Sequence, residues 1–168
     1  MADVRIAGLD PCARWSLRMP ETLLVDGFAA ELPVNRASRV EGRLCARLGP
    51  DEWLLCAPEN AAPNFDALQG RHHSLVDVSH RYAGFAVEGD AAHLVLAAGC
   101  PLDLDPAVFT AGSATRTLLG KAEIVLWRLD AAPAFRVECA RTFAPYVQAF
   151  LQEAAREFSS TELVDQLA

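Results

Sequence analysis

Residues 44–57 read LCARLGPDEWLLCA, two apolar runs on either side of a Gly-Pro-Asp turn. Proline presets the backbone for the second position of a tight turn, and glycine and aspartate are residues that turns favour. Apolar runs bounded by turn residues are typical of β-strands. The stretch therefore predicts a β-hairpin, and with it a fold built on antiparallel sheet.

A second hairpin is predicted further along the chain. Residues 135–139 alternate between apolar and charged side chains, which predicts a half-buried strand with Arg136 and Glu138 on its wet face. The run at 124–127 is apolar at every position, a pattern typical of a central strand. The segment 130–133 would join these two strands.

Two helices are predicted in the second half of the chain. The clearer one lies at residues 143–158, where apolar residues recur at spacings of three and four, and Thr142 is placed to cap its first turn. The other covers residues 91–98, about two turns. For it we expect Asp90 as the cap and Gly99 as a left-handed end.

The order of the predicted elements resembles one βαββαβ unit written twice. The remaining elements are a strand near residue 14, helices near 21 and 64, and strands at 74–79 and 82–88. This order predicts an α+β protein with antiparallel sheets and helices on one face of each. The halves would be 12–80 and 81–158. Because no Pro/Gly/Ser-rich linker separates them, residues 1–168 are expected to form a single compact domain. No prediction is made for the tail at 159–168.

Composition and charge exclude several classes of protein. Of 168 residues, 52% are hydrophobic and 22% charged, which predicts a packed globule. No apolar run approaches the ~20 residues that span a bilayer, and no signal peptide is recognisable, so we expect a cytoplasmic protein without a membrane partner. The net charge of −7 would repel a phosphate backbone, so nucleic acid is not an expected partner. The five cysteines are odd in number and widely spaced, which favours buried thiols over disulfides or a zinc site.

The segment Asp77-Val78-Ser79-His80-Arg81 is the most suggestive for chemistry. Strand alternation would place Asp77 and Ser79 on one face, with Val78 and His80 on the other. A serine nucleophile needs its base within hydrogen-bond reach, and neighbouring residues of a strand point apart. We therefore expect Asp77 and Ser79 to hydrogen-bond with loop backbone and not to catalyse a reaction.

Other residues of chemically active types have simpler interpretations. The side chains of His72 and His73 should diverge, and no further ligand lies at a metal-site spacing. The sequence contains no Gly-x-Gly-x-x-Gly or Walker loop, so it does not predict a nucleotide-binding site. Trp53 and Trp127 lie in apolar strands and are expected to be core or interface anchors. The residues alone thus predict a domain that acts by association.

Motifs in order along the chain narrow this further. They are Pro33-Val34-Asn35-Arg36 followed by the Leu-Gly-Pro-Asp-Glu-Trp-Leu-Leu of residues 48–55, then Val76–Arg81 with Phe85–Gly89 and Ala97–Leu104, and finally Thr115–Ala122 through Arg141-Thr142-Phe143-Ala144. Together they resemble the gamma subunits of heterotetrameric sarcosine oxidases, over roughly residues 12–158. Residues 77–80 also resemble a segment of the folate-dependent aminomethyltransferase of the glycine cleavage system.

The resemblance implies a fold and a role. The fold would be the folate-binding, aminomethyltransferase-like one, with two ferredoxin-like βαββαβ halves. The role would be that of a non-catalytic subunit that packs with alpha, beta and delta subunits. FAD, FMN, NAD and tetrahydrofolate would be held by the alpha and beta chains and zinc by delta. The complex would demethylate sarcosine oxidatively to glycine, form peroxide and pass the one-carbon unit to tetrahydrofolate.

No catalytic, cofactor-binding or metal-binding residue is assigned to this chain. The candidates for structural or subunit contacts are Trp53, Asp77, Ser79, His80 and Arg81. Two alternatives stay open. The chain could act alone as a folate-binding protein related to the aminomethyltransferases, or as a hydrolase that uses Ser79 and His80.

Overall fold

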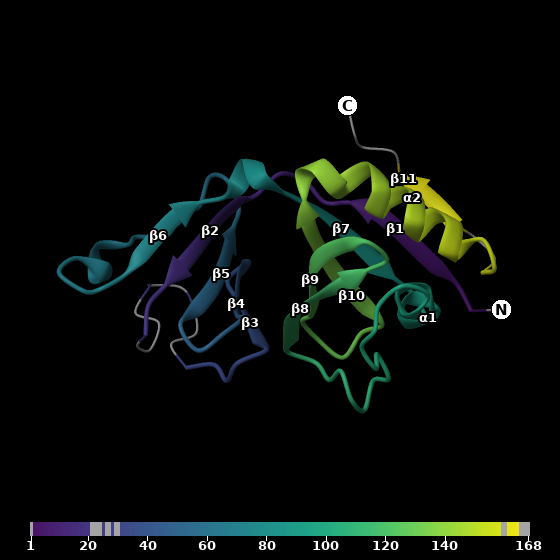
Figure 1. Cartoon of the computed structure of the whole chain (residues 1–168), viewed down its shortest axis with the longest axis horizontal. Coiled ribbons are helices and arrows are strands. Elements are labelled where there is room, and N and C mark those ends of the chain that lie inside the picture. The colour runs from purple at the N-terminus through teal and green to yellow at the C-terminus, as the bar shows by residue number, and fades with distance from the viewer. Residues whose placement is uncertain (1, 21–24, 26–27, 29–30, 159–160, 165–168) are drawn as a thin grey trace.

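The computed structural model describes residues 2–20, 25, 28, 31–158 and 161–164 (Figure 1). The strands are β1 (Val4–Gly8), β2 (Ala13–Arg18), β3 (Arg36–Val40), β4 (Arg43–Arg47), β5 (Glu52–Ala57), β6 (Ser74–Asp77), β7 (Tyr82–Glu88), β8 (Ser113–Leu119), β9 (Ala122–Arg128), β10 (Ala134–Ala140) and β11 (Thr161–Val164). The helices are α1 (Ala92–Ala97) and α2 (Ala144–Ala155), and the 3-10 turns are η1 (Asp66–Leu68), η2 (Ser79–Arg81) and η3 (Arg141–Phe143).

Both predicted hairpins are present. Strands β4 and β5 pair antiparallel, and the amide of Leu48 donates to the carbonyl of Glu52 at 2.8 Å across the Gly-Pro-Asp turn. Strands β9 and β10 pair antiparallel as well, with Leu126 opposite Val137. Each pair brings the apolar runs of the sequence side by side.

The strand order repeats from one half of the chain to the other. Strands β11-β1-β7-β10-β9-β8-β3-β4-β5-β2-β6 form one sheet in that order. In the first half β2 lies between β6 and β5, and β5 belongs to the meander β3-β4-β5. In the second half β7 takes the place of β2 beside the meander β8-β9-β10, and β1 is inserted between β7 and β11. The chain is an α+β protein with a mostly antiparallel sheet, as predicted.

The helices follow the prediction in the second half and depart from it in the first. Helices α1 and α2 lie on the second half (Figure 1). In the described part of the first half no α-helix occurs, and the helix predicted near residue 64 is the 3-10 turn η1. The helix predicted near residue 21 falls largely outside the described residues. Strand β1, which the sequence analysis missed, pairs with β7 and β11.

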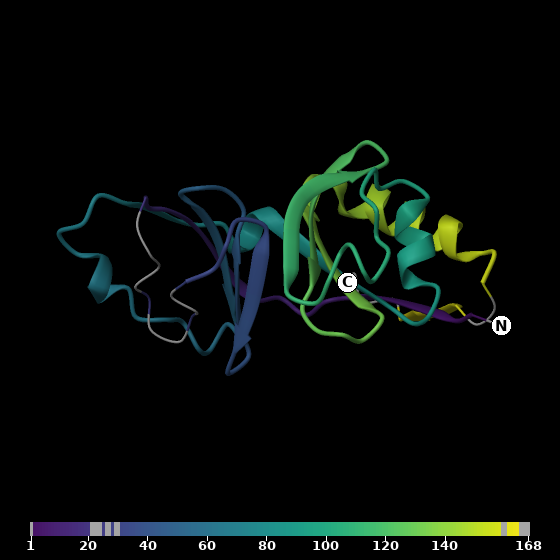
Figure 2. The ribbon, with the colours of Figure 1, turned by 90° about the horizontal axis from the view of Figure 1, so that it is seen from below.

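The chain has three apolar cores: one on the outer face of each half of the sheet, and an inner one between the two halves. The outer core of the first half contains Trp15, Leu17, Met19, Val25, Phe28, Cys45, Trp53, Leu55, Ala57 and Leu68. The inner core contains Ala37, Leu44, Ala46, Leu54, Cys56, Val78, Ala114, Val125 and Trp127. The outer core of the second half includes Val87, Val95, Ile124, Leu126, Val137, Val147 and Leu151. Strands β3–β5 and β8–β10 face each other across the inner core (Figure 2).

This layering explains why residues 53–57 of β5 and 124–127 of β9 are all apolar. Successive side chains of a strand point to opposite faces. In β5, Leu55 joins the outer core while Leu54 enters the inner core, and in β9 Leu126 and Trp127 divide in the same way. Both faces of these strands are therefore dry.

The predicted helix caps are not used. Helix α2 is preceded by η3, and Phe143 stands at its N-cap without a side-chain hydrogen bond, so Thr142 is not the cap. Helix α1 has Ala91 at its N-cap, again without a side-chain bond, and Asp90 lies outside it. Packing of the apolar faces stabilises both helices in place of capping.

Gly99 is needed for close packing and not for a left-handed turn. Its φ is not positive, contrary to the prediction. A Cβ atom at this position would lie 2.9 Å from the backbone nitrogen of Gly120 and would collide with the ring of Phe150. The end of α1 can approach α2 and the β8–β9 turn because this residue lacks a side chain.

Within the described part of the chain, no helix has the length and apolar composition needed to cross a membrane.

Trp127→Ala should lower the free energy of unfolding by about 3–5 kcal/mol, because it removes a fully buried ring from the inner core. Leu118→Ala on the neighbouring strand β8, where the side chain is exposed, is the control and should change it by about 0.5 kcal/mol or less. Urea unfolding followed by circular dichroism and by tryptophan fluorescence measures both.

The halves 12–80 and 81–158 share the inner core, so we expect the circular dichroism and fluorescence signals of the unmodified chain to give one unfolding transition. Separate transitions would contradict a single domain.

Candidate functional site

The segment that the sequence singled out bends away from the sheet after Asp77. Strand β6 ends there, and Ser79 begins the 3-10 turn η2, so the strand predicted to reach residue 79 is shorter. Val78 is buried in the inner core, whereas Asp77, His80 and Arg81 are exposed. The predicted two-face alternation therefore does not extend beyond Asp77.

Ser79 ties this turn to strand β2. Its hydroxyl accepts a hydrogen bond from the amide of Arg14 at 2.9 Å and donates to the Arg14 carbonyl at 3.4 Å. Its amide donates to Asp77 Oδ1 at 2.8 Å. Hydrogen bonds from the Ser79 hydroxyl and amide lower the pKa of Asp77. The predicted backbone network is present, although its partner is a strand and not a loop, and the hydroxyl is engaged with Arg14.

The other predicted site residues divide between surface and core. His80 and Arg81 line an open hollow together with Ala140, Arg141 and Thr142. Trp53 is 1% exposed in the outer core of the first half, where the Arg47 guanidinium lies 5.2 Å from its ring centroid. Trp53 is thus a core residue.

The most unusual group of side chains was not predicted at all. Arg14, Arg136 and Glu138 form a cluster between the halves, which we call the junction cluster. Arg14 Nε lies 3.0 Å from Glu138 Oε2, and Arg136 Nε donates to Glu138 Oε1 at 2.7 Å. Glu138 is fully buried and Arg14 is 3% exposed. Gly84 on the neighbouring strand leaves room, because a Cβ there would lie 3.2 Å from Glu138 Oε1.

The expectation that Glu138 lies on a wet face was wrong. Strand β10 alternates as predicted, but its charged face is covered by the first half of the chain, from which Arg14 reaches Glu138. The alternation of a strand reports which side chains share a face and not what covers that face. The only sequence signal for this ion cluster was the pair of charged residues, Arg136 and Glu138, on a strand between apolar neighbours. That signal does not identify Arg14, which lies 124 positions from Glu138, as the partner.

Two thiols lie beside the junction cluster. Arg136 Nη2 donates to Cys12 Sγ at 3.3 Å, and Arg14 Nη1 donates to the Cys12 carbonyl at 3.0 Å. A hydrogen bond with Cys56 and the charges of Arg14 and Arg136 lower the pKa of Cys12 to about 6, against burial and Glu138, which raise it. The pKa of the buried Cys56 thiol is raised by the same hydrogen bond and by burial.

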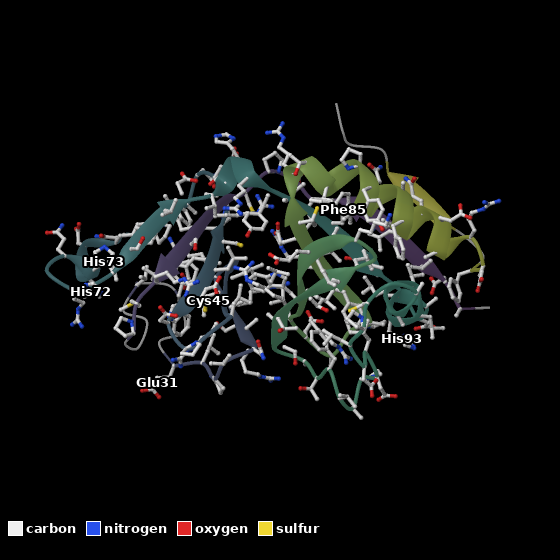
Figure 3. All side chains as sticks on the ribbon, viewed as in Figure 1. Glu31, Cys45, His72, His73, Phe85 and His93 are labelled. Carbon is white, nitrogen blue, oxygen red and sulfur yellow. The ribbon has the colours of Figure 1, made fainter. Side chains whose placement is uncertain are left out.

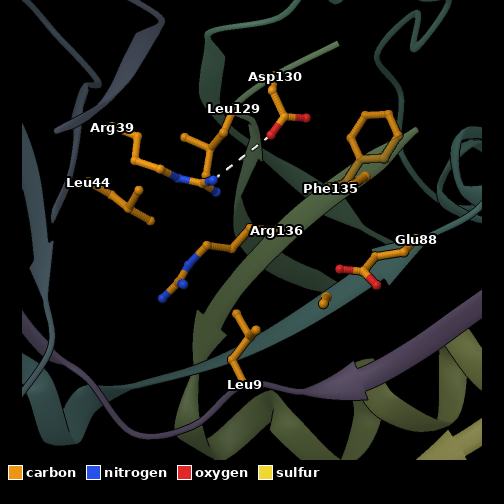
Figure 4. Close-up of a pocket in the computed structure, with 10 residues that line it drawn as sticks. Leu9, Arg39, Leu44, Glu88, Leu129, Asp130, Phe135 and Arg136 are labelled. Atoms are coloured by element: carbon orange, nitrogen blue, oxygen red, sulfur yellow. Dashed lines mark ion pairs between the residues drawn. The ribbon is translucent and has the colours of Figure 1, made fainter. Parts of the chain in front are cut away.

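These thiols line a pocket of ≈ 290 Å³ at the edge of the junction, which we call the junction pocket. Its lining residues are Leu9, Asp10, Pro11, Cys12, Gly42, Leu44, Cys56, Ala57, Pro58 and Arg136. A smaller pocket of ≈ 130 Å³ adjoins it and shares Leu9, Leu44 and Arg136 (Figure 4). An ion pair of 3.9 Å between Arg39 and Asp130 stands beside that second pocket.

Metal-ligating residues are scattered. Among the residues that the structure describes, no three His, Cys, Asp or Glu side chains lie close enough to hold a metal ion. His72 and His73 lie at the tip of the first half, and His93 lies in the second half (Figure 3). What the described residues bring together is an ion cluster and a thiol pair.

Sequence comparison points to one family. A family model described as sarcosine oxidase, gamma subunit family, matches residues 23–157. Sarcosine oxidase subunit gamma of Corynebacterium sp. (strain U-96) is 36% identical over 131 residues, which are 76% of this chain and 63% of that protein. Its counterpart from Corynebacterium sp. (strain P-1) is 35% identical over 127 residues, 74% of this chain and 62% of that one. The aligned part of the chain spans less than two thirds of these relatives.

Structural comparison extends the match to nearly the whole chain. A chain of the heterotetrameric sarcosine oxidase from Corynebacterium sp. U-96, in complex with pyrrole 2-carboxylate, superposes with a TM-score of 0.78 at 28% identity. The match covers 96% of this chain and 88% of that one. Aminomethyltransferase T of the glycine cleavage system from Bartonella henselae has a TM-score of 0.66 at 15% identity and covers 92% of this chain and 49% of that one. The second likeness establishes the predicted aminomethyltransferase-like fold.

Glu138→Ala should lower the free energy of unfolding by about 3–5 kcal/mol, because it leaves the buried guanidinium of Arg14 and the half-buried guanidinium of Arg136 without their carboxylate. The control is Glu123→Ala, which breaks the exposed ion pair with Arg116 and should cost less than about 1 kcal/mol. Both values come from urea unfolding at neutral pH. Equal losses in the two variants would mean that the junction cluster is not a buried ion network.

Proposed function

The chain belongs to the sarcosine oxidase gamma subunit family, and from this we propose that it is a non-catalytic subunit of a heterotetrameric sarcosine oxidase. The observation that carries the proposal is the superposition of 96% of the chain on a chain of such a complex. In this role it supports the oxidative demethylation of sarcosine to glycine, with peroxide formed and the one-carbon unit passed to tetrahydrofolate by the assembled complex. Its partners are alpha, beta and delta subunits, and it acts in the cytoplasm.

The proposal places FAD, FMN, NAD, tetrahydrofolate and zinc on the other subunits. The donor chemistry of this chain supports that assignment. Its sequence lacks a glycine-rich phosphate loop, and the described residues lack a set of side chains arranged to hold a metal ion. The contribution of this chain is then contact surface.

The surface proposed to dock on the alpha subunit is the one formed by η2 and η3. It consists of His80, Arg81, Arg141, Thr142 and Phe143, and we call it the η2–η3 face. All five are exposed, and Phe143 presents 43% of its area to solvent. Arginine and aromatic residues are enriched where proteins meet. Trp53 is excluded from this surface by its burial.

The double variant Arg81→Glu/Phe143→Ala should reduce recovery of the chain with a tagged alpha subunit by about tenfold or more, since it removes an aromatic contact and reverses a charge on this face. The matched control is Arg156→Glu/Leu94→Ala, an equivalent change at the exposed Arg156 that follows α2 and at the exposed Leu94 of α1, and it should co-purify normally. Co-expression of all four subunits, pull-down and sarcosine-dependent peroxide release provide the measurements.

Two outcomes of this experiment go against the proposal. If the η2–η3 variant co-purifies as the control does, the docking surface is wrong while the subunit role stands. If the unmodified chain binds no alpha subunit, the subunit role itself fails. Tetrahydrofolate binding by the isolated chain would then favour the stand-alone folate-binding alternative.

Ser79→Ala should leave sarcosine turnover of the assembled complex within a few-fold, because the hydroxyl is hydrogen-bonded to Arg14 backbone and not poised as a nucleophile. Loss of a true nucleophile costs on the order of 10⁴ or more in rate. Steady-state assay of complex with verified subunit content tests this. A loss of that size in a fully assembled complex would revive the hydrolase alternative.

A further inference from the structure

The junction cluster carries an unbalanced charge. Arg14 and Arg136 contribute two positive charges and Glu138 one negative charge, so the three together are net positive. A guanidinium cannot release its proton in a protein. A buried positive charge is costly unless an anion lies beside it. The sulfur of Cys12, which accepts from Arg136 Nη2 at 3.3 Å, is placed to be that anion.

The surroundings of Cys12 favour its thiolate at neutral pH. With a pKa of about 6, the thiol is largely ionised above that pH, whereas its ordinary value is 9.0. Cys56, Arg14 and Arg136 favour the thiolate, and Glu138 disfavours it. Asp10, the remaining acid on the lining of the junction pocket, is exposed to solvent.

Cys12 also differs from the other cysteines in access. It is partly exposed and lines the junction pocket, while Cys45, Cys56, Cys100 and Cys139 are buried. Burial raises the pKa of Cys139 to about 11. The pocket of ≈ 290 Å³ is roomy for a molecule the size of hydrogen peroxide, because a water molecule needs roughly 30 Å³. Low pKa and access together mark thiols that oxidise.

We propose that Cys12 is a redox-modification site, which a peroxide oxidises to the sulfenic acid within the junction pocket. The thiolate sulfur attacks one oxygen of the peroxide, a sulfur–oxygen bond forms and the oxygen–oxygen bond breaks. Hydroxide leaves and takes a proton from solvent to become water. The sulfur is oxidised and the peroxide reduced. The inference does not rest on the proposed function, because the peroxide can be supplied from outside.

The first test measures how the reactivity of Cys12 depends on pH. The purified full chain is treated with iodoacetamide from pH 4.5 to 9, and the Cys12 peptide is quantified by mass spectrometry. The rate should rise with a midpoint near pH 6, the pKa of the thiol. Arg136→Gln removes the guanidinium that contacts the sulfur and should move the midpoint upward by at least one pH unit. Arg39→Gln, which lines the adjoining pocket and pairs with Asp130, is the matched control and should leave it unchanged.

The second test uses hydrogen peroxide itself, with a cyclic diketone to trap sulfenic acid. Lowering a thiol's pKa increases the thiolate fraction but weakens its nucleophilicity, so at neutral pH the two effects nearly cancel. At about pH 5.5 the thiolate fraction dominates, and a one-unit rise in pKa should slow trapping at Cys12 by about threefold. We therefore expect the Arg136→Gln chain to react at least about threefold more slowly than the unmodified chain at this pH.

Clear results would overturn the proposal. A midpoint near pH 8.5 to 9 in the unmodified chain would do so, as would equal rates in Arg136→Gln and Arg39→Gln or trapped sulfenic acid at a cysteine other than Cys12. Circular dichroism checks that each variant is folded. If Arg136→Gln is not, Cys56→Ala replaces it, because loss of the Cys56 hydrogen bond should raise the midpoint as well.

Discussion

Burial of the same sheet on both faces is the constraint on which the rest of this structure depends. The inner core joins Leu54 of β5 to Trp127 of β9, so neither half of the sheet presents that face to water. Hydrophobic area is the main source of folding free energy, and here one set of side chains stabilises both halves. The same geometry forces the charged face of β10 into the interior. Arg14 and Arg136 pair with Glu138 there, because burying a carboxylate without partners would cost too much free energy.

Several internal polar groups of the chain are committed to tying segments of the fold together. Ser79 joins η2 to β2, the junction cluster joins β2 to β10, and Arg116 contacts Glu52 between β8 and β5. Groups engaged in this way are poor candidates for binding a substrate. The η2–η3 face, by contrast, exposes cationic and aromatic side chains to solvent. This distribution of polar groups favours a subunit that contributes contacts and rigidity.

Sequence reasoning succeeded where a local pattern determines structure. The Gly-Pro-Asp turn and the apolar runs at 44–57 gave the β4–β5 hairpin, and the spacing of apolar residues gave α2. It failed where distant segments decide. Glu138 looked solvent-facing because alternation cannot reveal that the first half covers β10. Cys12 looked like an ordinary thiol because its two arginines come from different strands. Thr142 looked like a cap, but η3 brings the chain into α2 by another route. The ordered motifs predicted the family correctly, because they extend over most of the chain and so reflect the whole fold.

Strand β1 has a consequence for how the chain folds as it is made. Ile6 pairs with Val87 on one side and with Leu163 on the other, so β1 lies between two strands that are synthesised long after it. Until β7 leaves the ribosome, β1 presents unpaired edges, a state that invites association with other chains. Closure of the second half therefore waits until β11 has been synthesised. Non-local pairings of this kind also slow folding, because the entropy of closing a long loop is lost before any contact compensates for it.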